Sequence, residues 1–246
     1  MMTVPRIFIT GDTHGLKDFK HVVDIQIYWE QDLNEKDVII ICGDAGLTWY
    51  NDGCKNLKFI LPYSRMNCQI VVIDGNHENF HMLEQYPKTT KFGGPVYQLS
   101  SSVFYLNRGY VYNINGQKFF VFGGGNSYDI IVRNTYLNWW PEERPTLKQF
   151  KQGHKSLDKH NWTVDYIVTH TCGLSDLDIL EDELDKCFRK DRENPEYDLN
   201  LYIDDLKHRC TYKKHFFGHF HEDIVIDRKT NALFQSYYEL TEYPKI

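Results

Sequence analysis

Short apolar runs alternate with polar loops along the first third of the chain. Residues 6–10, 37–42 and 69–73 are rich in β-branched side chains, and each run leads into Gly, Asp, Asn or His. Runs of this length and composition are typical of buried strands. Between them, residues 16–31 and 55–65 carry apolar side chains at helical spacing. The order strand, helix, strand, helix, strand predicts a parallel α/β opening.

The pattern changes in the middle of the chain. Residues 102–106, 110–114 and 118–122 alternate or run apolar, and Asn115-Gly116 between the last two is a strong hairpin signal. We therefore expect an antiparallel section here. Residues 123–162 have a Gly-rich start, a Tyr- and Trp-rich centre and no clean period. They predict an insertion of loops and short helices that covers the active site.

The last third returns to strands and helices. Residues 163–169 and 214–217 predict strands, and residues 197–210 have helical apolar spacing. Residues 224–226 and 232–236 predict a closing hairpin. Because no repeat or linker interrupts the 246 residues, we expect a single domain.

Composition narrows the classes of function. The formal net charge of −6 disfavours a dedicated nucleic-acid binder, which usually has a basic face. The 6 cysteines lack the short paired spacing of a zinc knuckle, so we expect reduced thiols. The apolar run at residues 6–10 is too short for a signal peptide or a membrane span. We therefore expect a cytoplasmic protein with no membrane partner.

Metal-capable side chains follow five of the predicted strands. Because the carboxyl ends of strands in an α/β sheet share one edge, such side chains converge there. Carboxylates, an amide oxygen and imidazoles make a mixed set that suits manganese, iron or zinc. The motifs are Gly11-Asp12-Thr13-His14-Gly15, Gly43-Asp44-Ala45-Gly46, Gly75-Asn76-His77-Glu78, Thr169-His170 and Gly218-His219-Phe220-His221.

The order of these motifs (D-x-H, G-D, G-N-H-E, a lone H and G-H-x-H) resembles that of the calcineurin-like metallophosphoesterase superfamily. The resemblance spans nearly the whole chain. It implies a four-layer α/β/β/α sandwich of two mixed sheets flanked by helices. It also implies that a hydroxide bridging two divalent ions hydrolyses a phosphate ester, with manganese expected and iron or zinc as alternatives.

The resemblance also implies a role for each motif residue. Asp44 bridges the two ions and is therefore catalytic, and His77 contacts a phosphate oxygen or protonates the leaving group. The other metal ligands fall into two sets, which are Asp12, His14 and His221 on one ion and Asn76, His170 and His219 on the other.

The sequence departs from the protein Ser/Thr phosphatase branch that it partly resembles. Leu47 stands where that branch has an aspartate that pairs with the catalytic histidine, and Asp74 stands where it has an arginine. That branch also has an arginine after the second motif, where this chain continues Ala45-Gly46-Leu47-Thr48-Trp49. Two phosphate-binding arginines are therefore absent from their expected places. A buried phosphate needs a cationic partner, so we look for one elsewhere.

The substitute that we expect is Arg133 in the aromatic segment, with Trp140 or Tyr128 stacking on a planar part of the substrate. The alternative for Arg133 is a surface salt bridge to Glu142 or Glu143. The alternative for the tryptophan is local packing within the segment.

These features favour a phosphomonoesterase that acts on a small phosphorylated or nucleotide-like substrate. A phosphodiesterase and a phosphoprotein phosphatase are the alternatives, because such a metal site serves all of them. A metal-binding scaffold of the same fold is disfavoured, since every ligand position is filled. An acidic chain lacks the cationic track that extended nucleic acid requires. Substrate identity and oligomeric state stay open at this point.

Overall fold

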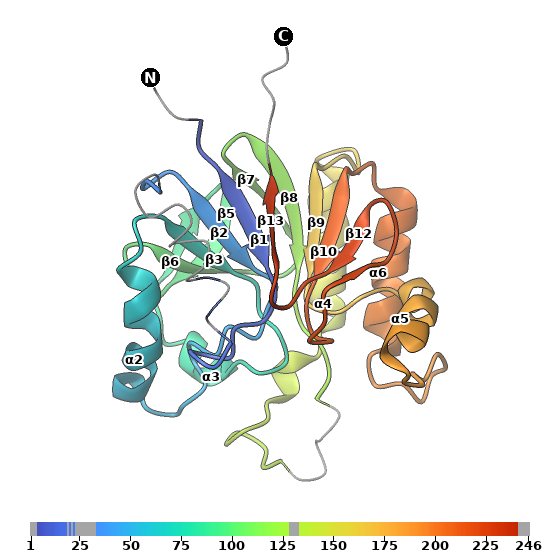
Figure 1. Ribbon diagram of the computed structural model, residues 1–246, viewed down its shortest axis with the longest axis horizontal. Helices are drawn as coiled ribbons and strands as arrows, with labels where there is room; N and C mark the ends of the chain where they lie inside the picture. Colours follow the sequence, from blue (N-terminus) through green and yellow to red (C-terminus); the bar gives the residue numbers. More distant parts are fainter. Residues whose placement is uncertain (1–3, 19, 21, 23–32, 128–132, 241–246) are drawn as a thin grey trace.

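The computed structural model describes the chain except for residues 1–3, 19, 21, 23–32, 128–132 and 241–246. Two sheets pack face to face, with helices on the outer faces (Figure 1). The helix predicted at residues 16–31 lies mostly outside the described residues. Within the described part of the chain, no helix has the length and apolar character needed to cross a membrane.

The first sheet has seven strands in the order β13-β1-β2-β3-β6-β5-β4. Its centre is parallel, as predicted, because β1, β2, β3 and β6 pair in the same direction. The outer strands β13, β5 and β4 pair antiparallel. The bounds are β1 Ile7–Thr10, β2 Val38–Ile41, β3 Gln69–Val72, β4 Lys88–Lys91, β5 Gly94–Gln98, β6 Val103–Leu106 and β13 Tyr237–Leu240.

The second sheet has six strands in the order β11-β12-β10-β9-β8-β7. The hairpin predicted around Asn115-Gly116 joins β7 to β8, and Asn115 takes the left-handed backbone that such a turn requires. From β8 to β12 the neighbouring strands are parallel. The bounds are β7 Tyr110–Ile114, β8 Gln117–Phe122, β9 Tyr166–Thr169, β10 Lys214–Phe217, β11 Ile224–Val225 and β12 Thr230–Ala232.

Helices cover both outer faces, which confirms the predicted four-layer sandwich. Ile9 points into the core between the sheets, whereas its neighbour Phe8 packs on the other face with Ile60. Burial on both faces explains why β1 is apolar without alternation. Leu157 and Ile203 cover the second sheet. The helices are α2 Gly53–Ser64, α3 Phe80–Leu83, α4 Leu147–Asp158, α5 Leu177–Leu184 and α6 Tyr197–Arg209, with 3₁₀ turns η2 Pro141–Glu143 and η3 Leu174–Asp176.

The predicted C-terminal hairpin is wrong in its second strand. The strand that pairs with β11 is β12, which ends at Ala232. The chain then crosses to the other sheet as β13, where Leu240 pairs with Ile7. Because β13 shields the outer edge of β1, this crossing ties the C-terminal part of the chain to the first sheet.

Two other segments differ from the sequence prediction. Residues 103–106 were expected in one antiparallel section with the hairpin, but β6 belongs to the first sheet, where it pairs parallel with β3 and antiparallel with β5. The segment 123–162 contains a helix of 12 residues, α4, rather than short helices alone. Thr146 and Gln149 form a capping box at its start, which is the sequence signal that the prediction overlooked.

Candidate metal centre

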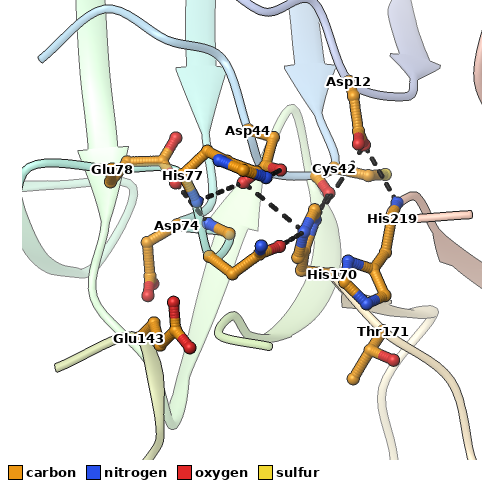
Figure 2. Close-up of polar contacts among 12 residues, drawn as sticks. Asp12, Cys42, Asp44, Asp74, His77, Glu78, Glu143, His170, Thr171 and His219 are labelled. Carbon is orange, nitrogen blue, oxygen red and sulfur yellow. Dashed lines mark hydrogen bonds and ion pairs between the residues drawn. The ribbon is translucent and has the colours of Figure 1, made fainter. Parts of the chain in front are cut away.

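The five polar motifs meet at one edge of the two sheets, at the carboxyl ends of β1, β2, β3, β9 and β10. Figure 2 shows His170 between the carboxylates of Asp44 and Asp12, with dashed contacts to both. The three residues come from three different strands. The convergence expected from the motif positions is therefore present in the fold.

Glycine at two of these motifs is required by close packing. A Cβ atom at Gly75 would lie 2.0 Å from Oδ1 of Asp44, and one at Gly218 would lie 2.2 Å from Oδ1 of Asp12. No side chain fits at such distances. These two glycines therefore allow the backbone of one motif to approach the carboxylate of another.

Several predicted ligands have a backbone conformation that non-glycine residues rarely adopt. Each such residue costs on the order of 1–3 kcal/mol, so it persists only where the surrounding structure enforces it. Residues of this kind cluster at functional sites. Those with positive φ are His14 (44°), Asp44 (49°), His219 (72°) and His221 (58°).

Asp12, His14 and His221 form one group whose ligand atoms lie within 4.8 Å of one another. Nε2 of His221 is 3.2 Å from Oδ2 of Asp12, and Nε2 of His14 is 3.9 Å from the same oxygen. The Nδ1 atom of His14 donates to Asp18 at 2.9 Å. A carboxylate on one ring nitrogen orients the other toward a metal, so Asp18 supports His14 as a ligand.

Asp12, Asp44 and His170 form a second group, whose ligand atoms also lie within 4.8 Å of one another. The Nδ1 atom of His170 donates to the carbonyl oxygen of Cys42 at 2.7 Å, which directs Nε2 toward Asn76 Oδ1 at 2.9 Å and Asp44 Oδ1 at 3.5 Å. Imidazole, amide and carboxylate thus face one another in a fully buried space. Asp12 belongs to both groups, whereas the family resemblance gave the shared position to Asp44.

The electrostatics of this buried cluster favour positive charge. Burial alone would lower the pKa of His170, but the carboxylates of Asp44 and Asp12 raise it to about 10. Burial alone would raise the pKa of Asp44, but His170 and His77 hold it well below its usual range. The site therefore keeps Asp44 ionised, which favours the binding of a cation.

The residues fit divalent metal ions. Oδ2 of Asp12 is buried and accepts no hydrogen bond from the described residues, although two imidazoles lie near it. A buried carboxylate oxygen without a donor is costly, and a metal ion is the partner that relieves this cost. The mixed oxygen and nitrogen donors also match the coordination preferences of manganese, iron and zinc.

Asn76 is oriented by a chain of hydrogen bonds that the sequence did not reveal. Its amide Nδ2 donates to Oγ of Ser127 at 3.2 Å, and that hydroxyl donates to Oε2 of Glu143 at 2.8 Å. The backbone N–H of Ser127 donates to the other oxygen of Glu143 at 2.9 Å. This arrangement orients the Asn76 amide so that its Oδ1, and not its Nδ2, lies next to His170. Glu143 is buried, and burial raises the pKa of its carboxyl.

His219 is held by another residue that the sequence analysis missed. Its Nε2 lies 3.3 Å from Oε1 of Glu196, and its backbone N–H donates to Asp12 at 3.0 Å. Glu196 also accepts from the N–H of Asn126 at 2.6 Å and the hydroxyl of Thr171 at 3.1 Å. A carboxylate that orients one nitrogen of an imidazole is common around metal ligands, where the other nitrogen binds the ion.

His77 and Arg133 lie side by side at the rim of the centre. The backbone N–H of His77 donates to Oδ1 of Asp44 at 2.8 Å, and its Nε2 is 3.8 Å from Oδ2 of the same carboxylate. Nη1 of Arg133 lies 3.2 Å from Nδ1 of His77 and donates to the carbonyl oxygen of Asn138 at 3.0 Å. Because a guanidinium can only donate, Nδ1 of His77 is the acceptor. Burial lowers the pKa of His77, and Arg133 lowers it further, against the opposing effect of Asp44.

The two carboxylates that were alternatives for Arg133 have other partners. Glu142 lies 3.5 Å from His81, and Glu143 binds Ser127. Trp140 is fully buried and meets Trp49 edge to face at 5.9 Å, which is the local packing that was the alternative to substrate stacking. Tyr128, the other predicted stacking residue, lies outside the described residues.

The structure shows what Asp74 and Leu47, the two departures from the phosphatase branch, contact in this protein. Asp74 forms a buried ion pair with Arg108, which also donates to the carbonyl oxygen of Glu143 at 3.2 Å. Leu47 is buried in the core on the outer face of the first sheet. The aspartate expected at this position is therefore replaced by core packing, and Arg133 contacts the nitrogen of His77 instead.

A cavity of about 580 Å³ opens over the metal centre. Its size suits a small ligand rather than a polymer. The cavity brings together predicted ligands, His77, Arg133 and a segment after α5 that was not assigned to the site from sequence. Its lining residues are Asp44, Asn76, His77, Ser127, Arg133, Lys186, Cys187, Phe188, His219, Phe220 and His221.

Comparison with known proteins agrees with this geometry. A search of curated proteins finds no match. A family model described as calcineurin-like phosphoesterase matches residues 5–223, a range that includes every predicted metal ligand. The match covers most of the 246 residues. The chain therefore belongs to the calcineurin-like phosphoesterase family.

Proposed function

We propose that this protein is a phosphomonoesterase that uses two divalent metal ions, with manganese first and iron or zinc as alternatives, on a small phosphorylated or nucleotide-like substrate. The observation that carries the proposal is that two ligand groups lie together and that one member of each, His221 and Asp44, lines the same cavity as His77 and Arg133. Asp12, His14 and His221 would hold one ion and Asn76, His170 and His219 the other. Asp44 would contact both.

When bound, the two ions supply an activated water and stabilise negative charge on the phosphoryl oxygens. The protein residues have separate tasks. Asp44 is kept ionised, and Asp18 and Glu196 orient ligand imidazoles from behind. These contacts fix the geometry before substrate arrives, which lowers the cost of reorganisation during the reaction.

His77 is positioned to give a proton to the leaving oxygen. Because Nδ1 accepts from Arg133, the proton of the neutral ring is on Nε2, the nitrogen that faces Asp44 and the cavity. Arg133 lines the same cavity, and its guanidinium can grip phosphate oxygens. One arginine would therefore orient the acid and bind the phosphate.

The proposal is tested with a substrate panel and a metal titration. Aryl phosphates, phosphodiesters, nucleotides and a phosphopeptide are assayed after reconstitution with manganese, iron or zinc, and metal content is measured by elemental analysis. We expect two ions per chain and the highest kcat/KM on small monoesters. A higher kcat/KM on the diester would favour the phosphodiesterase. A higher kcat/KM on the phosphopeptide would favour the phosphoprotein phosphatase.

Replacing Asp44 with Asn provides the matched control, because it removes one charge with little change of shape. This variant should lose metal and activity together. Metal binding without turnover of any substrate by the natural protein would favour the non-catalytic scaffold. Full activity of the metal-free protein would contradict the dinuclear mechanism. A metal content that never exceeds one ion per chain after reconstitution would contradict it as well.

A further inference from the structure

Lys186 lines the cavity over the metal centre but belongs to none of the motifs. Its side chain is exposed, and its ammonium forms no ion pair with the residues that the structure describes. It comes from the segment between α5 and α6, whereas Arg133 comes from the segment between β8 and α4. The cavity therefore contains a second cation from an independent part of the chain.

The segment that carries Lys186 is fixed to its surroundings. Asp185 ends α5 in a left-handed conformation, and the N–H of Lys186 donates to the carbonyl oxygen of Glu181 at 3.3 Å. The N–H of Phe188 donates to the Glu181 carboxylate at 2.7 Å, and its ring meets Phe220 edge to face at 5.6 Å. Phe220 lies between His219 and His221. These contacts hold Lys186 on the side of the metal centre formed by those two histidines.

Two neighbouring cations of this segment are paired with carboxylates. Lys190 pairs with Asp178 and Glu181, and Arg189 pairs with Glu193. Lys186 faces the cavity without such a partner among the described residues. Of these three cations, Lys186 is the one that lines the cavity.

The position of Lys186 restricts the substrate. In the proposed function, the metal ions and Arg133 bind the phosphoryl group that is transferred, and Arg133 lies on the His77 side. A phosphomonoester has one other place for negative charge, which is its leaving group. A lysine is a compact, strongly hydrated point charge that binds carboxylate or phosphate without strict geometry.

We infer that the substrate of this enzyme has a leaving group that is itself an anion and that Lys186 binds this second charge. The substrate class is then a phosphate ester or anhydride of a negatively charged acceptor, such as a nucleoside diphosphate or a phosphorylated carboxylic acid. This inference rests on the proposed function, which it narrows. Lys186 determines specificity and does not act on the reacting atoms.

The test compares two substrates that differ mainly in this charge. The leaving groups of 4-carboxyphenyl phosphate and 4-chlorophenyl phosphate have similar acidity, but only the first carries an anion. We expect the natural enzyme to prefer the carboxylated substrate in kcat/KM. The Lys186→Ala variant should reduce this preference roughly tenfold, mainly through KM, and Lys186→Glu should reduce it further.

Arg189→Ala is the matched control, because it removes the same charge from the same segment at a side chain that does not line the cavity. It should leave the preference unchanged. A second readout does not depend on turnover: calorimetry should show that 4-carboxybenzylphosphonate binds more tightly than benzylphosphonate and that Lys186→Ala removes this difference.

Equal kcat/KM for the two substrates in the natural enzyme would overturn the inference, as would an equal loss on both in Lys186→Ala. Either result would leave the proposed phosphoesterase function intact. If neither aryl phosphate is hydrolysed and neither phosphonate binds, the proposed function itself fails.

Discussion

Nη1 of Arg133 lies 3.2 Å from Nδ1 of His77, so an arginine contacts the histidine that pairs with an aspartate in the related phosphatase branch. The exchange reverses the charge beside the imidazole. A carboxylate would stabilise the protonated ring, whereas the guanidinium disfavours it and lowers the pKa of His77. In the proposed function, Arg133 would supply both phosphate affinity and histidine orientation, and its contact at Nδ1 favours the neutral Nε2–H form of the ring.

Replacing His77 with Ala should separate proton transfer from metal binding. We expect both ions to remain, because the metal ligands are other side chains. The value of kcat should fall by roughly 10²- to 10⁴-fold, the usual contribution of a general acid. The loss should shrink with leaving groups of low pKa, which need no proton. Unchanged turnover of an alkyl phosphate would show that His77 is not the acid.

Replacing Arg133 with Ala should cost roughly 2–4 kcal/mol of transition-state stabilisation, measured from kcat/KM. The pH dependence of kcat should also change, because the ring of His77 loses the donor at Nδ1. The Arg133→Lys variant restores the charge but not the forked geometry, so its activity should lie between those of the natural enzyme and Arg133→Ala. Equal activities of all three proteins would exclude Arg133 as the phosphate clamp.

Glu196 offers a test of the residues behind the metal ligands. Glu196→Gln keeps the shape but weakens the contact with Nε2 of His219, which lies 3.3 Å from the carboxylate. We expect metal affinity to fall by roughly 10- to 100-fold with little change in fold. Isothermal titration with manganese and circular dichroism measure the two properties. Unaltered affinity for both ions would mean that Glu196 is structural.

The convergence of the predicted metal ligands could be foreseen from sequence because they follow short apolar runs, most of which end in a glycine. The first strand shows this directly, since Ile7–Thr10 leads into Asp12 and His14. The parallel sheet then places the strand ends together. Periodicity and turn chemistry suffice for this part of the fold.

Other site residues could not be predicted because their role depends on tertiary placement. Glu196 and Lys186 lie in an irregular segment with no pattern of its own, and Ser127 contributes through its hydrogen bonds with Asn76 and Glu143. The aromatic composition of the segment around Trp140 did not reveal that this ring is buried. Likewise, β4 is polar and largely exposed at the edge of its sheet, so apolar periodicity gave no signal for it.

Stability should fall at acidic pH partly because of His215, which is fully buried in β10. The hydroxyl of Thr169 donates to the carbonyl oxygen of Thr171, so at 2.7 Å it accepts from Nε2 of His215. The Nδ1 atom then carries the acceptor lone pair and has no hydrogen-bond partner among the described residues. Protonation would put a charge on this buried nitrogen. Burial, together with Lys207, lowers the pKa of His215 well below its usual value.

The direction of the pH effect follows from proton counting. Below about pH 6.5 the unfolded chain binds a proton at His215 and the folded protein does not, so acid favours unfolding by about 1.4 kcal/mol per pH unit until the folded pKa is reached. Urea unfolding at pH 7.5 and pH 5.5 measures the change. His215→Gln keeps a donor near Nε2 but cannot be protonated, so its stability should fall less between these pH values. The comparison cancels the contributions of the other histidines, and parallel pH profiles for the two proteins would show that His215 is not responsible.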